Sequence, residues 1–158
     1  MFRHILCATD TSEDAERALR YASEIASETG GELHVVHVVE TLGAGKLAGQ
    51  NSHIGEQELK DKVRRQCAEI SDQLGIDVAV HMPYASAGAV ARCVADIAED
   101  NGVDLIVVGT RGRSVLAGAL LGSVAQGLLH YARCPVLAIP HHCVTELDKA
   151  GDAVTSAG

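Results

Sequence analysis

Short apolar runs alternate along this chain with longer segments whose apolar residues recur every three or four positions. The short runs are typical of strands, and the longer segments are typical of amphipathic helices. The runs cover residues 5–9, 33–39, 76–81, 104–108 and 135–139, and four helical segments lie between them. Such alternation implies right-handed crossovers between parallel strands. The sequence therefore predicts an α/β fold: a single domain with an open, doubly wound, five-stranded parallel sheet, helices on both faces, and a Rossmann-like architecture.

The residue types within these segments refine the prediction. In the first helical segment Ala15, Ala18 and Leu19 share one face, which must lie on the sheet. The run at 104–108 has no polar alternation, as expected of a strand covered on both faces. The run at 76–81 is short and the most polar, so we expect it at an edge of the sheet. Apolar helical faces begin near residues 15, 59, 91 and 120.

Two stretches show neither the short apolar runs typical of strands nor the repeat of three or four residues typical of helices. Residues 40–52 are polar and glycine-bearing and predict a loop, whereas residues 82–88 contain Pro83 and Gly88 and predict a connection. Beyond Pro140 the residues are mostly small and polar. We therefore expect one domain over residues 1–140 and a flexible tail over residues 141–158.

The charge balance limits the partners of this chain. It has 13 basic and 21 acidic side chains, a net charge of −8, and no block of Lys or Arg. This balance disfavours nucleic acid and anionic membranes as partners. Aromatic residues make up only 3% of the chain, too few for the stacking platforms of single-strand binders. A phosphorylated small molecule remains compatible, because backbone amides can hold phosphate without net positive charge.

The cysteines predict a reducing compartment. The five of them include no C-x-x-C pair, which argues against a disulfide framework or a zinc ribbon and favours buried, reduced thiols. The apolar stretch near the N-terminus is too short for a signal peptide, and no run approaches the length of a membrane span. We therefore expect a cytoplasmic protein.

Neither a catalytic set nor a metal site is predicted. His141, His142 and Cys143 are metal ligands by type, but adjacent residues in an unstructured tail rarely converge on an ion. We expect His34 and His37 to be hydrogen-bonded core histidines. The chain has no G-x-S-x-G or H-E-x-x-H motif, and no carboxylate pair falls in the predicted site.

A glycine-rich segment follows the strand predicted at 104–108. In an open parallel sheet, ligands bind beyond the carboxyl ends of the strands, where the strand order reverses. Gly109 and Gly112 lack a Cβ and let a ligand approach the backbone closely, whereas Gly122 and Ser123 place amides and a hydroxyl near a helix N-terminus, which favours anions. The residues alone leave two interpretations open: an anion site, or glycines that serve turns and close helix packing.

The spacing G-x2-G-x9-G-S after an apolar strand resembles the nucleotide-binding motif of the universal stress protein family, in its ATP-binding type. The resemblance covers about residues 2–140 and includes the segments at 5–10, 36–39 and 134–139. It implies a sheet of order 3-2-1-4-5, with the nucleotide across the junction of the first and fourth strands. It also implies a homodimer formed through the last strand.

Carried over position by position, the resemblance implies contacts to ATP, with Mg²⁺ held through the phosphates. Asp10 matches an acidic residue near the adenosine, and its other interpretation is helix capping. Arg111 is a further candidate for phosphate, against the alternative of a solvated arginine. The predicted binding residues are Ala8, Thr9, Asp10, Val38, Val108, Gly109, Arg111, Gly112, Gly122, Ser123 and Val124.

The function that this resemblance implies is a nucleotide-dependent regulatory module of the stress response, and not an enzyme beyond weak ATP hydrolysis. Three alternatives remain open: a slow ATPase or phosphotransferase, a dimerisation module without nucleotide, and a binder of AMP or cyclic AMP. The sequence also departs from many relatives at the pocket edge, because no proline follows Gly88 and Thr11 follows the aspartate.

Overall fold

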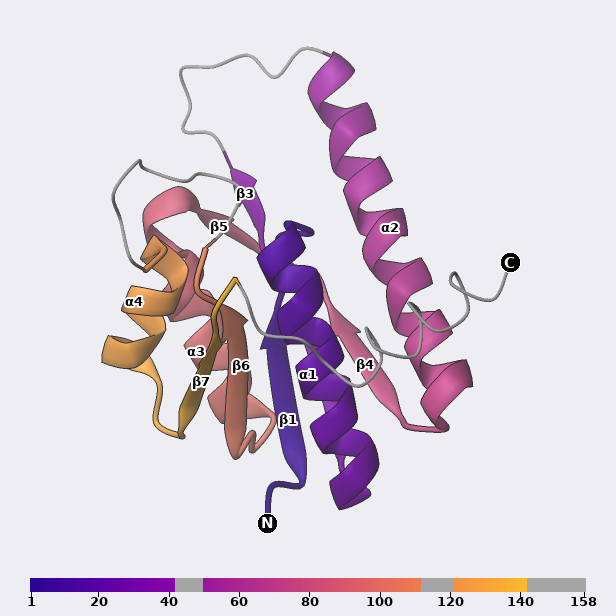
Figure 1. The fold of residues 1–158 in the computed structure, drawn as a ribbon. Coiled ribbons are helices and arrows are strands. Elements are labelled where there is room, and N and C mark those ends of the chain that lie inside the picture. Colours follow the sequence, from indigo (N-terminus) through magenta and orange to yellow (C-terminus); the bar gives the residue numbers. More distant parts are fainter. Residues whose placement is uncertain (42–49, 112–120, 142–158) are drawn as a thin grey trace.

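The computed structural model describes residues 1–41, 50–111 and 121–141, and its centre is a five-stranded parallel sheet (Figure 1). The strands are β1 (His4–Ala8), β2 (Glu32–Val36), β4 (Val78–His81), β6 (Leu105–Gly109) and β7 (Val136–Ile139). Their order is β4-β2-β1-β6-β7, and every neighbouring pair is parallel. This order confirms the 3-2-1-4-5 sheet, with the polar strand β4 at one edge.

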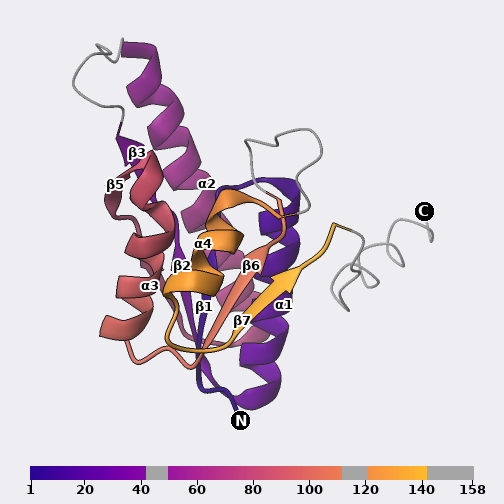
Figure 2. The same ribbon diagram turned by 90° about the vertical axis from the view of Figure 1, so that its left-hand side faces the viewer.

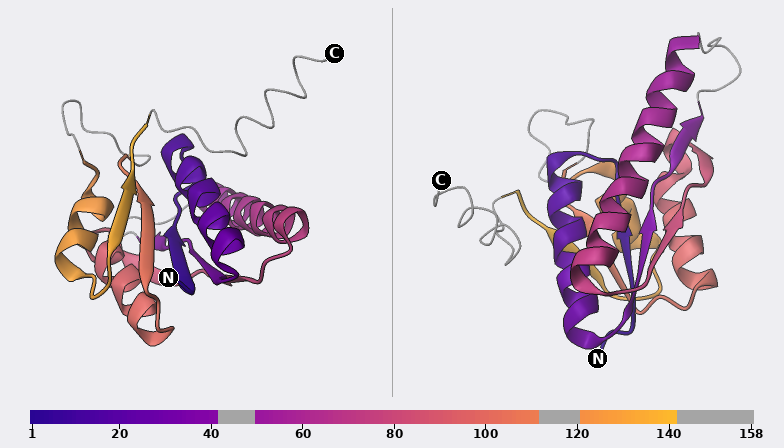
Figure 3. Two further views of the ribbon diagram at one scale, coloured as in Figure 1. Left: turned by 60° about the horizontal axis from the view of Figure 1, so that its bottom comes forward. Right: turned by 90° about the vertical axis from the view of Figure 1, so that its right-hand side faces the viewer.

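Helices cover both faces of the sheet. Figure 2 shows α3 (Val90–Asp100) and α4 (Ser123–Tyr131) in front of it, and the right-hand view of Figure 3 shows α1 (Glu13–Thr29) and α2 (Gln50–Leu74) on the other side. Side chains alternate along each strand, so the core forms two layers. On β1, Ile5 and Cys7 pack toward α1 and α2, whereas Leu6 and Ala8 pack toward α3 and α4. All residues of β6 are buried, as predicted.

A second, two-stranded parallel sheet was not predicted. It pairs β3 (Val39–Thr41) with β5 (Tyr84–Ser86), and the 3₁₀ turn η1 (Ala87–Ala89) follows β5. The predictions of a loop from residue 40 and a plain connection at 82–88 are therefore wrong at these positions. Each strand has three residues, too few to show an alternating pattern, and each forms only by pairing with a distant segment. Residues 42–49 of the predicted loop lie outside the described residues.

Helix α2 begins at Gln50, well before the apolar face predicted from residue 59. From Glu56 on, polar side chains of this helix pair with one another one turn apart. The Lys60 ammonium lies 2.6 Å from Glu56 Oε1 and 2.8 Å from the Tyr84 hydroxyl of β5. These hydrogen bonds, first of all the one to Glu56, raise the pKa of Lys60. The contact also joins α2 to the small sheet.

The cysteines agree in part with the prediction. The four that the structure describes are free thiols; Cys7 and Cys67 are buried, but Cys93 and Cys134 are only half-buried. Burial raises the pKa of all four, that of Cys67 to about 11. Cys143 and the rest of the predicted tail from residue 142 lie outside the described residues. No helix in the described part of the chain has the length and apolar character to cross a membrane.

Candidate functional site

The candidate site lies where β1 and β6 end side by side, at the carboxyl ends of the strands and away from the N-terminus (Figure 1). The chain leaves β1 toward α1 on one face of the sheet, and the helix after β6, α4, packs on the other face. Connections that depart to opposite faces leave a crevice between them, which is where ligands bind in open α/β sheets.

The backbone after β1 is fixed by hydrogen bonds to its neighbours. The buried Thr9 donates its amide to Val36 O at 2.9 Å, which continues the pairing of β1 with β2. His37 Nδ1 lies 3.0 Å from Thr9 O, and because a carbonyl oxygen only accepts, Nδ1 carries the proton. His37 is thus a buried, hydrogen-bonded histidine, as predicted, and it also positions the end of β1.

The Asp10 carboxylate closes a turn. Its Oδ1 accepts a hydrogen bond from the Ser12 amide at 3.0 Å. The interpretation of Asp10 as the helix cap is wrong, because the cap of α1 is Ser12, whose hydroxyl accepts from the Ala15 amide at 3.3 Å. The turn holds the Asp10 side chain, which is half-buried, just beyond the end of β1.

Thr11 has an unusual backbone conformation, with φ at 63°. A β-branched residue rarely adopts the left-handed region, and such strain is frequent at binding sites. Two contacts hold it in place: its amide donates to Thr9 Oγ1 at 3.2 Å, and Lys62 Nζ donates to its carbonyl at 3.5 Å. The residue types around Thr11 do not signal this strain, which only the backbone geometry shows.

Gly109, at the end of β6, lies directly against the first turn of α1. A Cβ at this position would be 2.8 Å from both the carbonyl carbon and the carbonyl oxygen of Asp14, closer than real Cβ contacts. The absent side chain therefore lets α1 approach the end of β6. Of the two interpretations left open for the glycines, close helix packing holds for Gly109.

Asp14 itself is a buried carboxylate that the sequence analysis missed. Its Oδ1 lies 2.6 Å from Nδ1 of His141, at the start of the predicted tail, and 3.4 Å from Arg17. Among the described residues, its Oδ2 has no hydrogen-bond partner. Nothing in the pattern singled Asp14 out, because an acidic residue in the first turn of a helix is common.

One hydrogen bond joins the two halves of the glycine-rich motif. The Gly122 amide donates to Thr110 O at 2.7 Å, and Thr110 in turn donates its amide to Ile139 O on β7 at 3.0 Å. The N-terminus of α4 therefore lies beside the end of β6, as predicted. The Gly122 amide is not free for phosphate, however, because Thr110 already accepts from it.

Ser123 begins α4, and the capping residue Gly122 makes no side-chain bond to the helix. The first amides of a helix have no partner within it, so the N-terminus of α4 offers donors and the positive end of the helix dipole. The Ser123 side chain is exposed beside it. This arrangement suits an anion such as a phosphate group.

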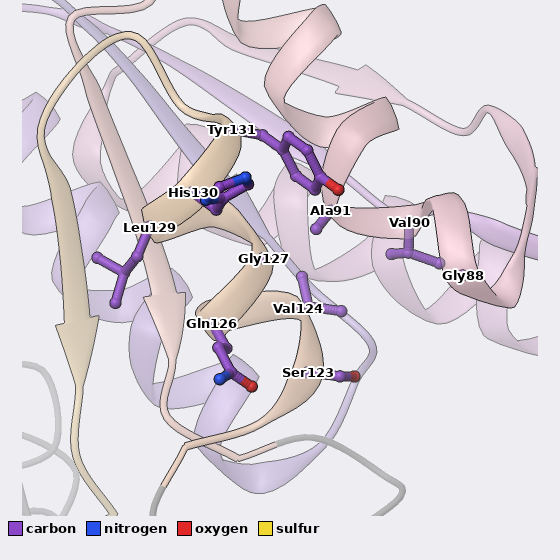
Figure 4. A pocket seen from close by; sticks show the side chains of 10 residues that line it. All are labelled: Gly88, Val90, Ala91, Ser123, Val124, Gln126, Gly127, Leu129, His130 and Tyr131. Carbon is purple, nitrogen blue, oxygen red and sulfur yellow. The ribbon is translucent and has the colours of Figure 1, made fainter.

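A cavity of about 630 Å³ opens between α4 and the start of α3 (Figure 4). Two of the predicted residues, Ser123 and Val124, line it from α4, and Val90 and Ala91 line it from α3. The remaining lining residues are Gly88, Gln126, Gly127, Leu129, His130 and Tyr131. Of these, Gly88 lies in η1, directly after the short strand β5.

The other predicted residues fall into three groups. Ala8 and Val108 are paired across β1 and β6 and are buried on the face of α3 and α4, where the half-buried Val38 also packs. Arg111 is exposed. Gly112 lies outside the described residues. The structure thus brings together the ends of β1 and β6 and the start of α4 around one edge of the sheet.

Solved structures share this fold. Protein MJ0577 of Methanocaldococcus jannaschii matches with a TM-score of 0.73 and 25% identity, over 91% of this chain and 99% of that one. The universal stress protein of Archaeoglobus fulgidus, solved in complex with dAMP, matches with a TM-score of 0.63 and 26% identity, over 88% of this chain and 98% of that one.

Sequence comparison extends the likeness to nearly the whole chain. Universal stress protein A homolog 1 of Coxiella burnetii is 33% identical over 141 residues, which cover 87% of this chain and 96% of that protein. The model of the universal stress protein family matches residues 1–140, from the strand before Asp10 to the strand that accepts the Thr110 amide. By its sequence, its sheet order and its motif, this chain belongs to the universal stress protein family.

Proposed function

We propose that this protein binds an adenine nucleotide, ATP with Mg²⁺ held through the phosphates, and acts as a nucleotide-dependent regulatory module of the stress response. One observation carries the proposal: the bond from the Gly122 amide to Thr110 O sets the N-terminus of α4 beside the end of β6. One of the two strands beside β6 is β1, and the Asp10 turn follows directly from the end of β1.

The residues around this edge fit the parts of the nucleotide. Asp10 accepts hydrogen bonds from the ribose hydroxyls, because carboxylate oxygens are strong acceptors for sugar hydroxyls. Ser123 and the first amides of α4 bind phosphate, with Arg111 as a further partner. Val38 provides an apolar surface for the base. Gly112 completes the phosphate loop in this proposal.

The relatives support the class of ligand. The Archaeoglobus fulgidus protein carries dAMP in its solved complex. The free thiols of the described cysteines fit a reducing compartment, and we place the protein in the cytoplasm. We propose that residues 1–140 form the nucleotide-binding domain and that residues 141–158 form a tail.

Replacing Ser123 with alanine is expected to weaken ATP binding about 10-fold or more, because a hydrogen bond to a charged group contributes about 1.5–3 kcal/mol. Calorimetric titration of the full-length protein in Mg²⁺ buffer measures the change. The matched control is Ser27→Ala. Ser27 is exposed near the C-terminal end of α1, far from the proposed site, so this variant is expected to bind ATP like the wild type. Equal affinities for the two variants would contradict the role of Ser123.

We also propose a homodimer formed through β7. This strand ends the sheet order, and its Leu137 is 36% exposed, so a second copy would cover an apolar edge. Light scattering is expected to give the mass of two chains, and Leu137→Lys to give one chain. Val80→Lys, on the other edge strand and 37% exposed, is the control that stays dimeric. A monomeric wild-type protein would refute the proposal.

A further inference from the structure

Three metal-ligating side chains meet at the other end of the strands, where β1 and β2 begin. His4 of β1 pairs in register with Glu32 of β2, and His34 follows two residues along β2, on the same face as Glu32. Glu32 Oε2 lies 3.7 Å from His4 Nδ1, and Glu32 Oε1 lies 3.6 Å from His34 Nε2. One ligand atom from each residue lies within 4.8 Å of the other two.

The His34 ring is buried, with 5% of its surface exposed, and its Nε2 has no hydrogen-bond partner among the described residues. Its Nδ1 lies 3.1 Å from Nε2 of His81, the last residue of β4. The prediction of a hydrogen-bonded core histidine therefore holds for one of its two ring nitrogens. The other nitrogen faces the Glu32 carboxylate.

Neither neutral tautomer of His34 satisfies this nitrogen. When Nδ1 donates to His81, Nε2 presents a lone pair to a carboxylate oxygen, which also presents lone pairs. When His81 donates to Nδ1, the proton on Nε2 faces an oxygen at 3.6 Å, beyond normal hydrogen-bond distance. A cation between Nε2 and the carboxylate would satisfy both groups.

The spacing of these atoms fits a transition metal. Two ligands at about 2.1 Å from a tetrahedral ion lie about 3.4 Å apart. The two separations of 3.6 and 3.7 Å, one to each oxygen of the Glu32 carboxylate, are close to this value, and the three ligand atoms, which lie within 4.8 Å of one another, move closer together when they bind one ion. We infer that this chain binds a divalent transition-metal ion of the Zn²⁺ type through His4, Glu32 and His34. Two imidazoles and one carboxylate form a known zinc set, whereas Mg²⁺ and Ca²⁺ prefer oxygen ligands.

The surroundings complete the site. His81 is the outer partner that orients the His34 ring, and the two rings are stacked with centroids 5.3 Å apart. A cavity of about 330 Å³, lined by His4 and Glu32 together with Arg3, Gly30, Gly31 and Asp77, gives the ion a path from solvent and leaves room for a water molecule as fourth ligand. The site is independent of the proposed nucleotide site, which lies beyond the other ends of the same strands.

The test is titration of the full-length protein, purified free of metal, with Zn²⁺, alongside the visible absorption of tetrahedral Co²⁺. Wild-type protein is expected to bind one Zn²⁺ per chain at this site. His4→Asn and Glu32→Gln alter partly exposed side chains, and each is expected to weaken binding more than 100-fold and remove the Co²⁺ band. His81→Asn is expected to weaken it about 10- to 100-fold, as the loss of an outer partner does.

Two controls separate this site from other ligands in the chain. His130→Asn, on an exposed histidine of α4, and the double variant His142→Asn with Cys143→Ser are both expected to bind Zn²⁺ like the wild type. Circular dichroism confirms that each variant is folded. Absence of Zn²⁺ binding in the wild type, affinity unchanged by His4→Asn and Glu32→Gln, or binding that is lost in the double tail variant would overturn the inference.

Discussion

Replacing Gly109 with alanine is expected to lower the free energy of unfolding by about 1–3 kcal/mol, the range for overpacked cores. The new Cβ would lie 2.8 Å from the backbone carbonyl of Asp14, and a backbone group cannot rotate away as a flexible side chain can. The first turn of α1 must therefore move off the end of β6. Urea unfolding followed by circular dichroism measures the loss.

Gly55→Ala is the matched control for this substitution. Gly55 lies within α2, and a Cβ there meets no atom within 4 Å. Alanine is the better helix former, so this variant is expected to be as stable as the wild type or more stable by up to about 1 kcal/mol. If Gly109→Ala unfolds at the same urea concentration as Gly55→Ala, the close packing of α1 on β6 is not a constraint on this fold.

A second large effect is expected at Gly127, where α4 crosses α3. A Cβ at Gly127 would lie 2.5 Å from the Cβ of Ala91, which has no freedom to turn aside. Gly127→Ala is expected to destabilise the protein by about 1–2 kcal/mol, even though alanine favours helix formation. The helices would separate, and the cavity between them, which Ser123 lines, would change shape.

A double-mutant cycle isolates this contact. Ala91→Gly alone is expected to cost about 1 kcal/mol from helix propensity, but in the Gly127→Ala background it removes the clash and restores stability. Urea unfolding of the four proteins gives the coupling energy, which is expected to be stabilising and about 2–3 kcal/mol. Additive losses in the double variant would show that the two helices do not meet at these residues.

The large sheet could be predicted because its pattern is local and repeated. The buried run of β6 and the one-sided helices carry their periods in the sequence, and the family resemblance supplied the strand order. The sheet of β3 and β5 could not be predicted, since three-residue strands such as Tyr84–Ser86 form only through a distant partner. The part of α2 before residue 59 contains polar pairs such as Glu56 with Lys60, which carry no apolar signal.

In the candidate sites, too, local features could be predicted and contacts between distant segments could not. The position of Ser123 at a helix N-terminus followed from the motif, but the donation of the Gly122 amide to Thr110 depends on a loop closing in space. The packing role of Gly109 follows from the position of Asp14 in space, which no local pattern of the sequence indicates. The cluster of His4, Glu32 and His34 could not be predicted, because His4 and Glu32 are 28 positions apart in the sequence and meet only through the register of β1 with β2.

Equilibrium dialysis of the full-length protein against labelled ATP in Mg²⁺ buffer tests the central claim most directly. The proposed site predicts saturable binding of one ATP per chain, with AMP and cyclic AMP competing for the same site. A sample that is folded by circular dichroism, yet retains no ATP, AMP or cyclic AMP at any concentration of the nucleotide, would contradict it.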